Sequence, residues 1–369
     1  MKTLFTFSLS ILLLISCRND VIDEKPLVAK IDPVENMYFG KTVVDPYRYM
    51  ENLEDSAVIT WIKSQADYAR KVLNSIPGRQ SLIDKMMEFD ERRSSFISQL
   101  AITDDDRYFY LKQTPYDETG KLYYRNGYEG EEILLFDPCI YGDDTTKKYV
   151  ISGLLPSFDG GKVVFGLAEG GSESATTLIM DVDKKTLYPG QIKNCYASYS
   201  WLDDNKSFSY TPLHSDDIKD INRGIDLEAK LHIVGTIPAN DRIILSRKTH
   251  PELGIMPKEI PDVIYNKDCD YLFGIASTVD RNLKVYYAPG YEINKKQINW
   301  LSLIEPEYQI HDDYMNKKEL YVLTSKNAPN YKILKTDLEN PNIKNSEVVV
   351  PEDQNDIIKS LNLTNDGLY

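Results

Sequence analysis

The sequence predicts a mainly β protein: an incomplete β-propeller of about five four-stranded blades and the start of a sixth, preceded by two amphipathic α-helices. The first observation is that after Ser94 the apolar residues come in short runs separated by Asp, Asn and Gly, the pattern of strands and hairpins. The second is a weak repeat of an apolar run, a polar turn and an aromatic-rich run, which has the length of a propeller blade. Successive turn markers are 54, 45, 63 and 49 residues apart, at Asp105, Asp159, Asp204, Lys267 and Asn316.

The first 16 residues predict a lipoprotein signal peptide. Lys2 precedes an apolar run over residues 4–15, which is too short to span a membrane stably. Residues 14–17 (LISC) resemble the bacterial lipobox, in which the cysteine is acylated and becomes the mature N-terminus. Cys17 is therefore the predicted lipid anchor, and the expected location is the bacterial cell envelope, with the protein periplasmic or outer-membrane-facing. An ordinary signal peptide that ends near a cysteine is the alternative.

Two amphipathic helices are predicted within residues 45–93. In the first, apolar residues from Val58 to Leu73 recur at steps of three and four, and Asp55 or Ser56 can cap the N-terminus. The second helix follows Pro77 and Gly78. Its apolar stripe consists of Leu82, Ile83, Met86 and Phe89.

The sequence thus divides into four predicted parts. The second of them, residues 17–44, is a tether that carries charges and prolines without periodicity, so little fixed structure is expected before about Asp32. Near the last residue, Leu361–Gly367 (LNLTNDG) is interpreted as the opening of a sixth unit. Because five units and a fragment leave sheet edges unpaired, the propeller is expected to be truncated. The parts are the signal peptide (1–16), the tether (17–44), the N-terminal helical segment (45–93) and the truncated β-propeller (94–369).

Charge and composition exclude several classes of function. The formal net charge is −14 at pH 7 with no basic block, so nucleic acid is not an expected partner. Because the sequence has no Walker loop, dinucleotide-binding glycine motif, H-E-x-x-H motif or EF-hand loop, no cofactor and no metal site are expected. Paired aspartates such as Asp203 and Asp204 are interpreted as hairpin turns. Cys139, Cys195 and Cys269 fit neither a disulfide framework nor metal-ligand spacing and are expected to be buried free thiols.

Several segments resemble those of a known family. Residues 45–52 (DPYRYMEN) resemble the D-P-Y-R-W-L-E-D segment that opens the prolyl oligopeptidase family of serine peptidases. Four later segments resemble family segments in the same order: 166–173 (GLAEGGSE), 199–204 (YSWLDD), 328–333 (APNYKI) and 350–352 (VPE). Because the matches are ordered and extend from about Asp32 to the last residue, the resemblance is specific.

The resemblance implies an architecture and a role. In the family, a β-propeller is inserted near the start of an α/β-hydrolase domain, and the Ser-Asp-His triad lies after the propeller. The chain would then be the propeller portion of a peptidase that cleaves short proline-containing peptides after proline, with the propeller gating access. The resemblance also implies that Tyr196, five residues before Trp201, reaches toward the substrate pocket. An aromatic residue that fills a blade interface is the alternative.

No catalytic residue is predicted in this sequence. A serine peptidase of this class needs a G-x-S-x-G nucleophile motif with a later Asp and His, and no such motif occurs. Ser172, in GGSES, is the nearest imitation and is interpreted as part of a blade turn. The four histidines are interpreted as surface or blade residues: His214, His232, His250 and His311. The chain alone is therefore expected to be inactive. The alternative function is an envelope-anchored, non-catalytic propeller that binds peptides or a partner protein.

Overall fold

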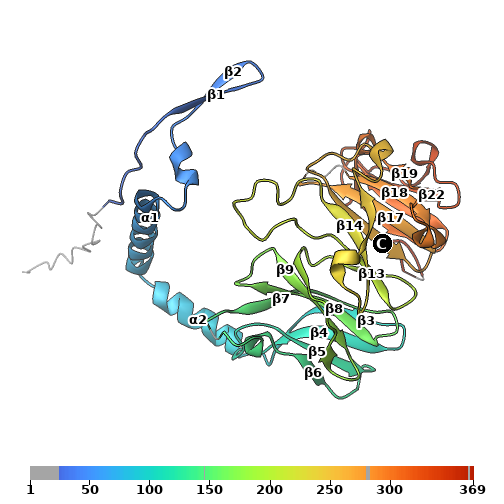
Figure 1. Ribbon diagram of the computed structural model, residues 1–369, viewed down its shortest axis with the longest axis horizontal. Helices are drawn as coiled ribbons and strands as arrows, with labels where there is room; N and C mark the ends of the chain where they lie inside the picture. The colour runs from blue at the N-terminus through green and yellow to red at the C-terminus, as the bar shows by residue number, and fades with distance from the viewer. Residues whose placement is uncertain (1–24, 145, 280–282, 365) are drawn as a thin grey trace, which may run out of the picture. The chain divides into compact units, whose positions relative to one another are not determined.

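The computed structural model describes residues 25–144, 146–279, 283–364 and 366–369. The chain divides into two compact units, one up to Arg93 and one from Ser94 onward (Figure 1). The predicted signal peptide and the predicted lipid anchor Cys17 lie outside the described residues. Among those that are described, no helix is both long and apolar enough to cross a membrane.

The first unit contains the two predicted helices, α1 (Ser56–Ser75) and α2 (Arg79–Glu91). Asp55, one of the two predicted caps, accepts a hydrogen bond from the backbone N–H of Ala57 at 2.8 Å and so satisfies a helix-end donor. Gly78 separates the helices with a left-handed φ of +82°, a conformation that glycine adopts without steric cost. An extended segment runs beside α1, because Leu27 bonds Ser64 and Gln65 through its backbone N–H and C=O.

The first unit also contains a hairpin within the range predicted as a tether. β1 (Val34–Tyr38) and β2 (Lys41–Asp45) pair antiparallel, and the 3₁₀ helix η1 (Arg48–Glu51) follows them. The two residues of the turn, Phe39 and Gly40, both have positive φ, +50° and +77°. Such two-residue turns match the twist of a hairpin. Because Phe-Gly is not a usual sequence for this turn, composition alone did not reveal the strands.

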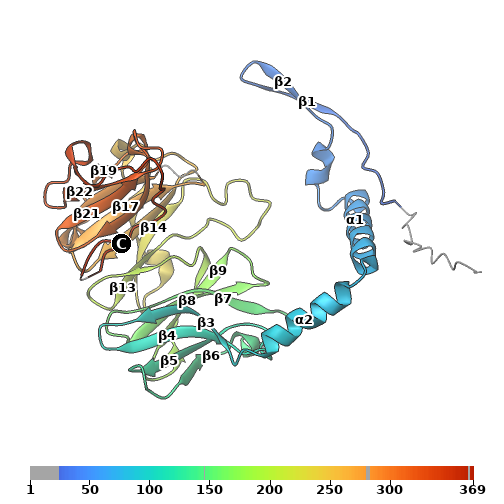
Figure 2. The ribbon, with the colours of Figure 1, turned by 180° about the vertical axis from the view of Figure 1, so that it is seen from behind.

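The second unit is a succession of antiparallel sheets, and five of them are present in the described residues (Figures 1 and 2). Within each sheet the strands pair with their neighbours in sequence, and β11 adds to β9 of the second sheet. The first two sheets consist of β3 (Phe96–Ile102), β4 (Arg107–Gln113), β5 (Lys121–Asn126) and β6 (Ile133–Phe136), then β7 (Tyr149–Pro156), β8 (Lys162–Glu169), β9 (Ala175–Asp181), β10 (Thr186–Leu187) and β11 (Ile192–Cys195).

The remaining three sheets repeat the same four-stranded meander. The third consists of β12 (Ser200–Trp201), β13 (Ser207–Tyr210), β14 (Glu228–Ile233) and β15 (Arg242–Ser246), and the fourth of β16 (Ile260–Asn266), β17 (Tyr271–Ser277), β18 (Lys284–Pro289) and β19 (Leu301–Ile304). The fifth consists of β20 (Ile310–Met315), β21 (Glu319–Thr324), β22 (Lys332–Asp337) and β23 (Glu347–Val350). Short 3₁₀ turns lie between strands: η2 (Pro138–Ile140), η3 (Pro238–Asn240), η4 (Pro251–Leu253), η5 (Gly290–Asn294), η6 (Pro306–Tyr308) and η7 (Ile343–Asn345).

The repeat found in the sequence corresponds to the first hairpin of each sheet. The five turn markers lie between β3 and β4, β7 and β8, β12 and β13, β16 and β17, and β20 and β21. The predicted mainly β, propeller-type fold is therefore confirmed. After the fifth sheet, Asn362, in the segment interpreted as the opening of a sixth unit, exchanges two backbone hydrogen bonds of 2.8 Å with Tyr369.

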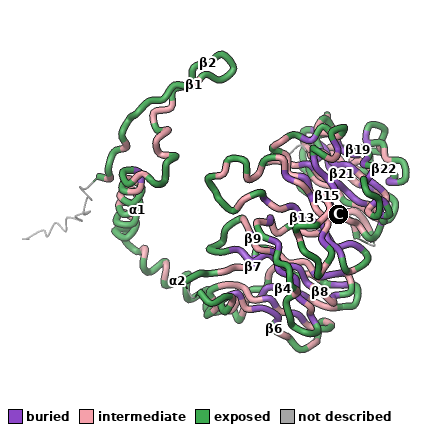
Figure 3. Tube along the Cα trace, viewed as in Figure 1, coloured by how far each residue is buried: buried purple, intermediate pink, exposed green. Residues whose placement is uncertain are grey.

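The core of the second unit lies between neighbouring sheets. Phe109 and Leu122 of the first sheet pack against Phe165 and Leu178 of the second, and equivalent clusters join each later pair of sheets. Burying an apolar side chain of this size contributes roughly 1.5–3 kcal/mol, so the stacking of sheets is the main source of stability. Figure 3 shows buried residues concentrated on these strands, whereas α1 and α2 are mostly exposed.

Candidate functional site

The segment that carries Tyr196 connects β11 of the second sheet to β12 of the third. Ala197 lies directly against two glycines of the second sheet: a Cβ added to Gly153 would be 2.7 Å from the Ala197 carbonyl oxygen, and one added to Gly166 would be 2.8 Å from the Ala197 Cβ. The Tyr199 hydroxyl lies 2.9 Å from Thr177 Oγ1 of β9. The segment is therefore held closely against the second sheet.

Ser198 joins the same segment to the fourth sheet. Its hydroxyl donates a hydrogen bond of 2.8 Å to Asp262 Oδ2, on β16, the first strand of that sheet. Burial raises the pKa of Asp262 above its usual range, although the Ser198 hydroxyl and the Val263 N–H act in the opposite direction. Among the described residues, no cationic side chain offsets the effect of burial on this carboxylate. Tyr196 itself is half-buried, and its carbonyl accepts the Ser198 N–H at 2.7 Å.

The first hairpin turns of the first four sheets are in contact, and those of the third and fourth sheets follow β12 and β16. Lys267, after β16, forms an ion pair with Asp104, 163 residues earlier in the turn between β3 and β4. The Lys267 ammonium also lies 5.1 Å from the centroid of the Phe158 ring, in the turn between β7 and β8. The backbone N–H of Asp159 donates to Asn205 Oδ1 at 3.2 Å. We call these five residues the turn cluster; its contacts join the first hairpin turns of four sheets.

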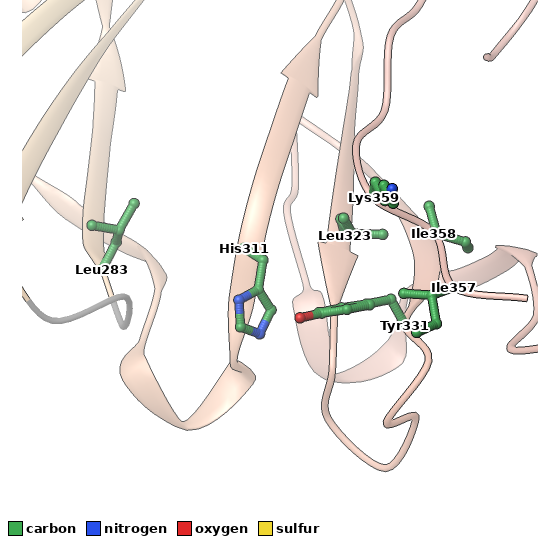
Figure 4. Close-up of a pocket in the computed structure, with 7 residues that line it drawn as sticks. All are labelled: Leu283, His311, Leu323, Tyr331, Ile357, Ile358 and Lys359. Carbon is green, nitrogen blue, oxygen red and sulfur yellow. The ribbon is translucent and has the colours of Figure 1, made fainter. Parts of the chain in front are cut away.

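A cavity of about 600 Å³ lies beside the fifth sheet (Figure 4). The His311 and Tyr331 rings meet edge to face, with centroids 4.9 Å apart, and Figure 4 shows the Tyr331 hydroxyl directed toward His311. Tyr331 has a φ of +69°, which is unusual for a bulky residue. Sequence patterns could not predict this cavity, because segments distant in the sequence contribute its lining: Leu283, His311, Leu323, Tyr331, Ile357, Ile358 and Lys359.

The cavity does not contain a catalytic triad. His311 Nε2 lies 2.8 Å from Ser325 Oγ, a distance suited to a nucleophile and its base. Within the described residues, however, no carboxylate bonds the other ring nitrogen, and Ser325 follows a strand instead of occupying a strand-to-helix turn. The arrangement can bind an apolar or aromatic group but lacks the parts for acyl transfer.

The other sequence candidates are not assembled into a catalytic site either. Ser172 lies in an exposed turn after β8, where its Oγ accepts the Ser174 N–H at 3.0 Å. His232 is fully buried on β14 with Nδ1 2.9 Å from Asp241, and its Nε2 has no hydrogen-bond partner in the described structure. Sequence spacing did not identify this pair because the two residues come together only across the β14–β15 connection.

The three described cysteines are free, as expected, but they are not all buried. Cys195 and Cys269 are buried, whereas Cys139 is exposed in η2. The expectation was wrong for Cys139 because η2 is a surface turn, in which Asp137 accepts the Cys139 N–H at 2.9 Å.

Comparisons with known proteins agree on one family. Residues 26–369 match the family model described as the prolyl oligopeptidase N-terminal β-propeller domain. The chain is 22% identical over 342 residues to the prolyl endopeptidase of Elizabethkingia meningoseptica, covering 92% of this chain and 46% of that protein. It is 24% identical over 359 residues to prolyl oligopeptidase A of Amanita bisporigera, covering 88% of this chain and 45% of that protein.

Solved structures show the same fold. A structure from a study of two prolyl endopeptidases superposes with a TM-score of 0.74 at 24% identity, over 93% of this chain and 49% of that one. Prolyl oligopeptidase B from Galerina marginata superposes with a TM-score of 0.73 at 20% identity, over 92% of this chain and 50% of that one. The chain spans about half the length of the curated relatives it matches. Its sequence matches the family model over nearly its whole length, and the chain belongs to the prolyl oligopeptidase family.

Proposed function

We propose that this chain is the propeller part of a serine peptidase that cleaves short peptides after proline, and that the propeller controls which substrates reach the catalytic groups. The match of residues 26–369 to the family's propeller domain carries the proposal. The sequence contains no G-x-S-x-G motif, so the Ser-Asp-His triad would lie outside these 369 residues.

Two features at the ends of β12 and β16 support a role in substrate access. The turn cluster joins turns of different sheets through the Lys267–Asp104 ion pair and the contact of Lys267 with the Phe158 ring. The segment with Tyr196 precedes β12, and the turn with Asn205 follows β12, so the two lie at opposite ends of this strand. We expect the propeller to act as a size filter that excludes folded proteins and admits extended peptides. The proposal includes contact between such a peptide and Tyr196.

An activity assay on the purified chain tests where catalysis lies. A fluorogenic peptide with a cleavable bond after proline is expected to stay intact, because no triad is assembled in the described residues. Ser172→Ala is the matched variant and is expected to behave identically. Turnover by the purified chain would contradict the proposal, and its loss in Ser172→Ala would identify Ser172 as the nucleophile.

Sequencing the source DNA past the codon for Tyr369 tests the peptidase assignment itself. The proposal expects a reading frame that encodes further blades and a hydrolase domain with G-x-S-x-G, Asp and His. Unrelated sequence after a stop codon would overturn it in favour of an envelope propeller that binds peptides or a partner protein.

The lipid anchor is also a proposal, based on residues 14–17. We expect the full-length chain, expressed in a bacterial host, to fractionate with membranes and to incorporate radiolabelled palmitate. Cys17→Ser is expected to lose the label and to leave the membrane fraction, whereas Cys139→Ser, at an exposed but unrelated cysteine, is the control and should retain both. A Cys17→Ser protein that is still labelled would exclude this anchor.

A further inference from the structure

We infer that the hydrogen bond between Ser198 and Asp262 holds Tyr196 in position for substrate, so that both are positioning residues of the proposed access site. The inference rests on the proposed function, because Tyr196 has a substrate only if the chain serves a peptidase. The two residues are 64 positions apart and belong to different sheets, so the contact exists only in the folded propeller.

The segment from Tyr196 to Tyr199 is restrained from two sides. On the second sheet, Ala197 fills the space left by Gly153 and Gly166, and Tyr199 bonds Thr177. On the fourth sheet, Ser198 bonds Asp262. Since Ala197 and Ser198 are the two residues after Tyr196, release of either contact would let the Tyr196 backbone move.

The chemistry of the bond suits a positioning role. A hydroxyl that donates to an ionised carboxylate forms a charge-assisted bond, which is stronger than a bond between neutral groups. The Asp262 carboxylate is half-buried, and the Ser198 hydroxyl and the Val263 N–H at 2.9 Å are its hydrogen-bond donors in the described residues. Ser198 itself is exposed, so the segment is accessible to a ligand.

Fluorine NMR of the full chain labelled with 3-fluorotyrosine tests the inference, with the Tyr196 signal assigned by Tyr196→Phe. In the wild type this signal is expected to shift with pH around a midpoint above the ordinary aspartate value of 3.8, because burial raises the pKa of Asp262. Asp262→Asn and Ser198→Ala are expected to abolish the shift, and Ser198→Thr, which keeps the hydroxyl, to retain it. Circular dichroism verifies that each variant is folded.

Asp313→Asn is the matched control. Asp313 is also a half-buried aspartate on the first strand of its sheet, β20, and burial raises its pKa as well, but it does not bond the Tyr196 segment. The Asp313→Asn variant should leave the pH-dependent shift of the Tyr196 fluorine signal unchanged. A Tyr196 signal that titrates in Ser198→Ala as in the wild type would overturn the inference.

A second arm separates this inference from the proposed function. A proline-containing tripeptide is added to the wild type and to Ser198→Ala, and the shift of the Tyr196 signal is followed. A response in the wild type that is lost in Ser198→Ala supports both claims. If the pH titration behaves as expected but the peptide changes no signal, the bond positions Tyr196 and the substrate role of Tyr196 is wrong.

Discussion

At the scale of single residues, glycine determines how closely the sheets approach. Gly166, in the middle of β8, has side chains on three sides of the place where a Cβ would lie. The Ala197 segment can therefore touch the second sheet only because position 166 lacks a side chain. Gly166 is in an extended strand and not at a positive φ, so its role is steric and not conformational.

Gly166→Ala should lower the free energy of unfolding by about 1–3 kcal/mol, the range for overpacking a filled core. The new Cβ would lie 2.6 Å from Ser152 Oγ, 2.8 Å from the Ala197 Cβ and 3.1 Å from the Ala175 Cβ. Urea denaturation measures the change. Gly224→Ala, where no atom lies within 4 Å of the added Cβ, is the control and should change stability by about 0.5 kcal/mol or less. Equal effects of the two substitutions would refute the packing argument.

At the scale of elements, hydrogen bonds within turns hold the hairpins. In the connection between β4 and β5, Asp117 accepts both the N–H and the hydroxyl of Thr114, at 2.8 and 2.6 Å. Lys121 bridges Asp117 and Asp137, at 2.9 and 3.1 Å. The bonds from Thr114, followed by the one from Lys121, lower the pKa of Asp117 to about 2.

This turn should make stability depend on pH. Because the pKa of Asp117 is lower in the folded chain than its ordinary 3.8, its contribution is complete above about pH 5 and is lost as the pH falls toward 2. Asp117→Asn removes the titrating group, so the free energy of unfolding should fall less between pH 5 and pH 3 than in the wild type. Chemical denaturation at both pH values measures this. Asp143→Asn, in an exposed loop, is the control and should show the same pH dependence of the free energy of unfolding as the wild type. If Asp117→Asn also shows the wild-type pH dependence, the Asp117 carboxylate does not stabilise the turn in this way.

The turns were predictable because their signals are local in sequence. Asp159 and Asp204 each bond backbone N–H groups two or three residues later, so the aspartates that mark the turns also stabilise them. The Ser198–Asp262 contact and the Figure 4 cavity were not predictable, since each joins side chains from different sheets or segments. Tyr196 was identified only through the family resemblance, because no local pattern distinguishes it from the other tyrosines of the blades.

At the scale of the whole second unit, contacts between residues far apart in sequence link sheets that are not neighbours along the chain. The Lys267–Asp104 ion pair links the first sheet to the fourth, and both side chains are substantially exposed, at 40% and 59%. An exposed ion pair contributes little to stability, about 0–1 kcal/mol. Its effect should therefore be on local opening of the turn cluster more than on global unfolding.

Lys267→Ala should accelerate hydrogen exchange in the turns at residues 103–106 and 157–161 while lowering the free energy of unfolding by only about 1 kcal/mol. The difference in hydrogen-exchange rate between Lys267→Ala and the wild type should be smaller at high salt, since salt screens exposed charges. Lys317→Ala changes a lysine in the equivalent turn of the fifth sheet and should have no effect on either turn. Identical exchange in the two variants would show that the ion pair does not hold the cluster.

The tryptophans make the junctions between sheets optically distinguishable. Trp201 donates its indole N–H to Leu155 O of the second sheet, and Trp300 donates to Ile244 O of the third, at 3.0 and 3.2 Å. The third tryptophan, Trp61, lies in α1 of the first unit. In each of three variants, two of the tryptophans are replaced by phenylalanine. The fluorescence of the remaining tryptophan then reports on its own surroundings only. Time-resolved fluorescence could then establish the order in which the helical unit and two successive sheet junctions lose their structure.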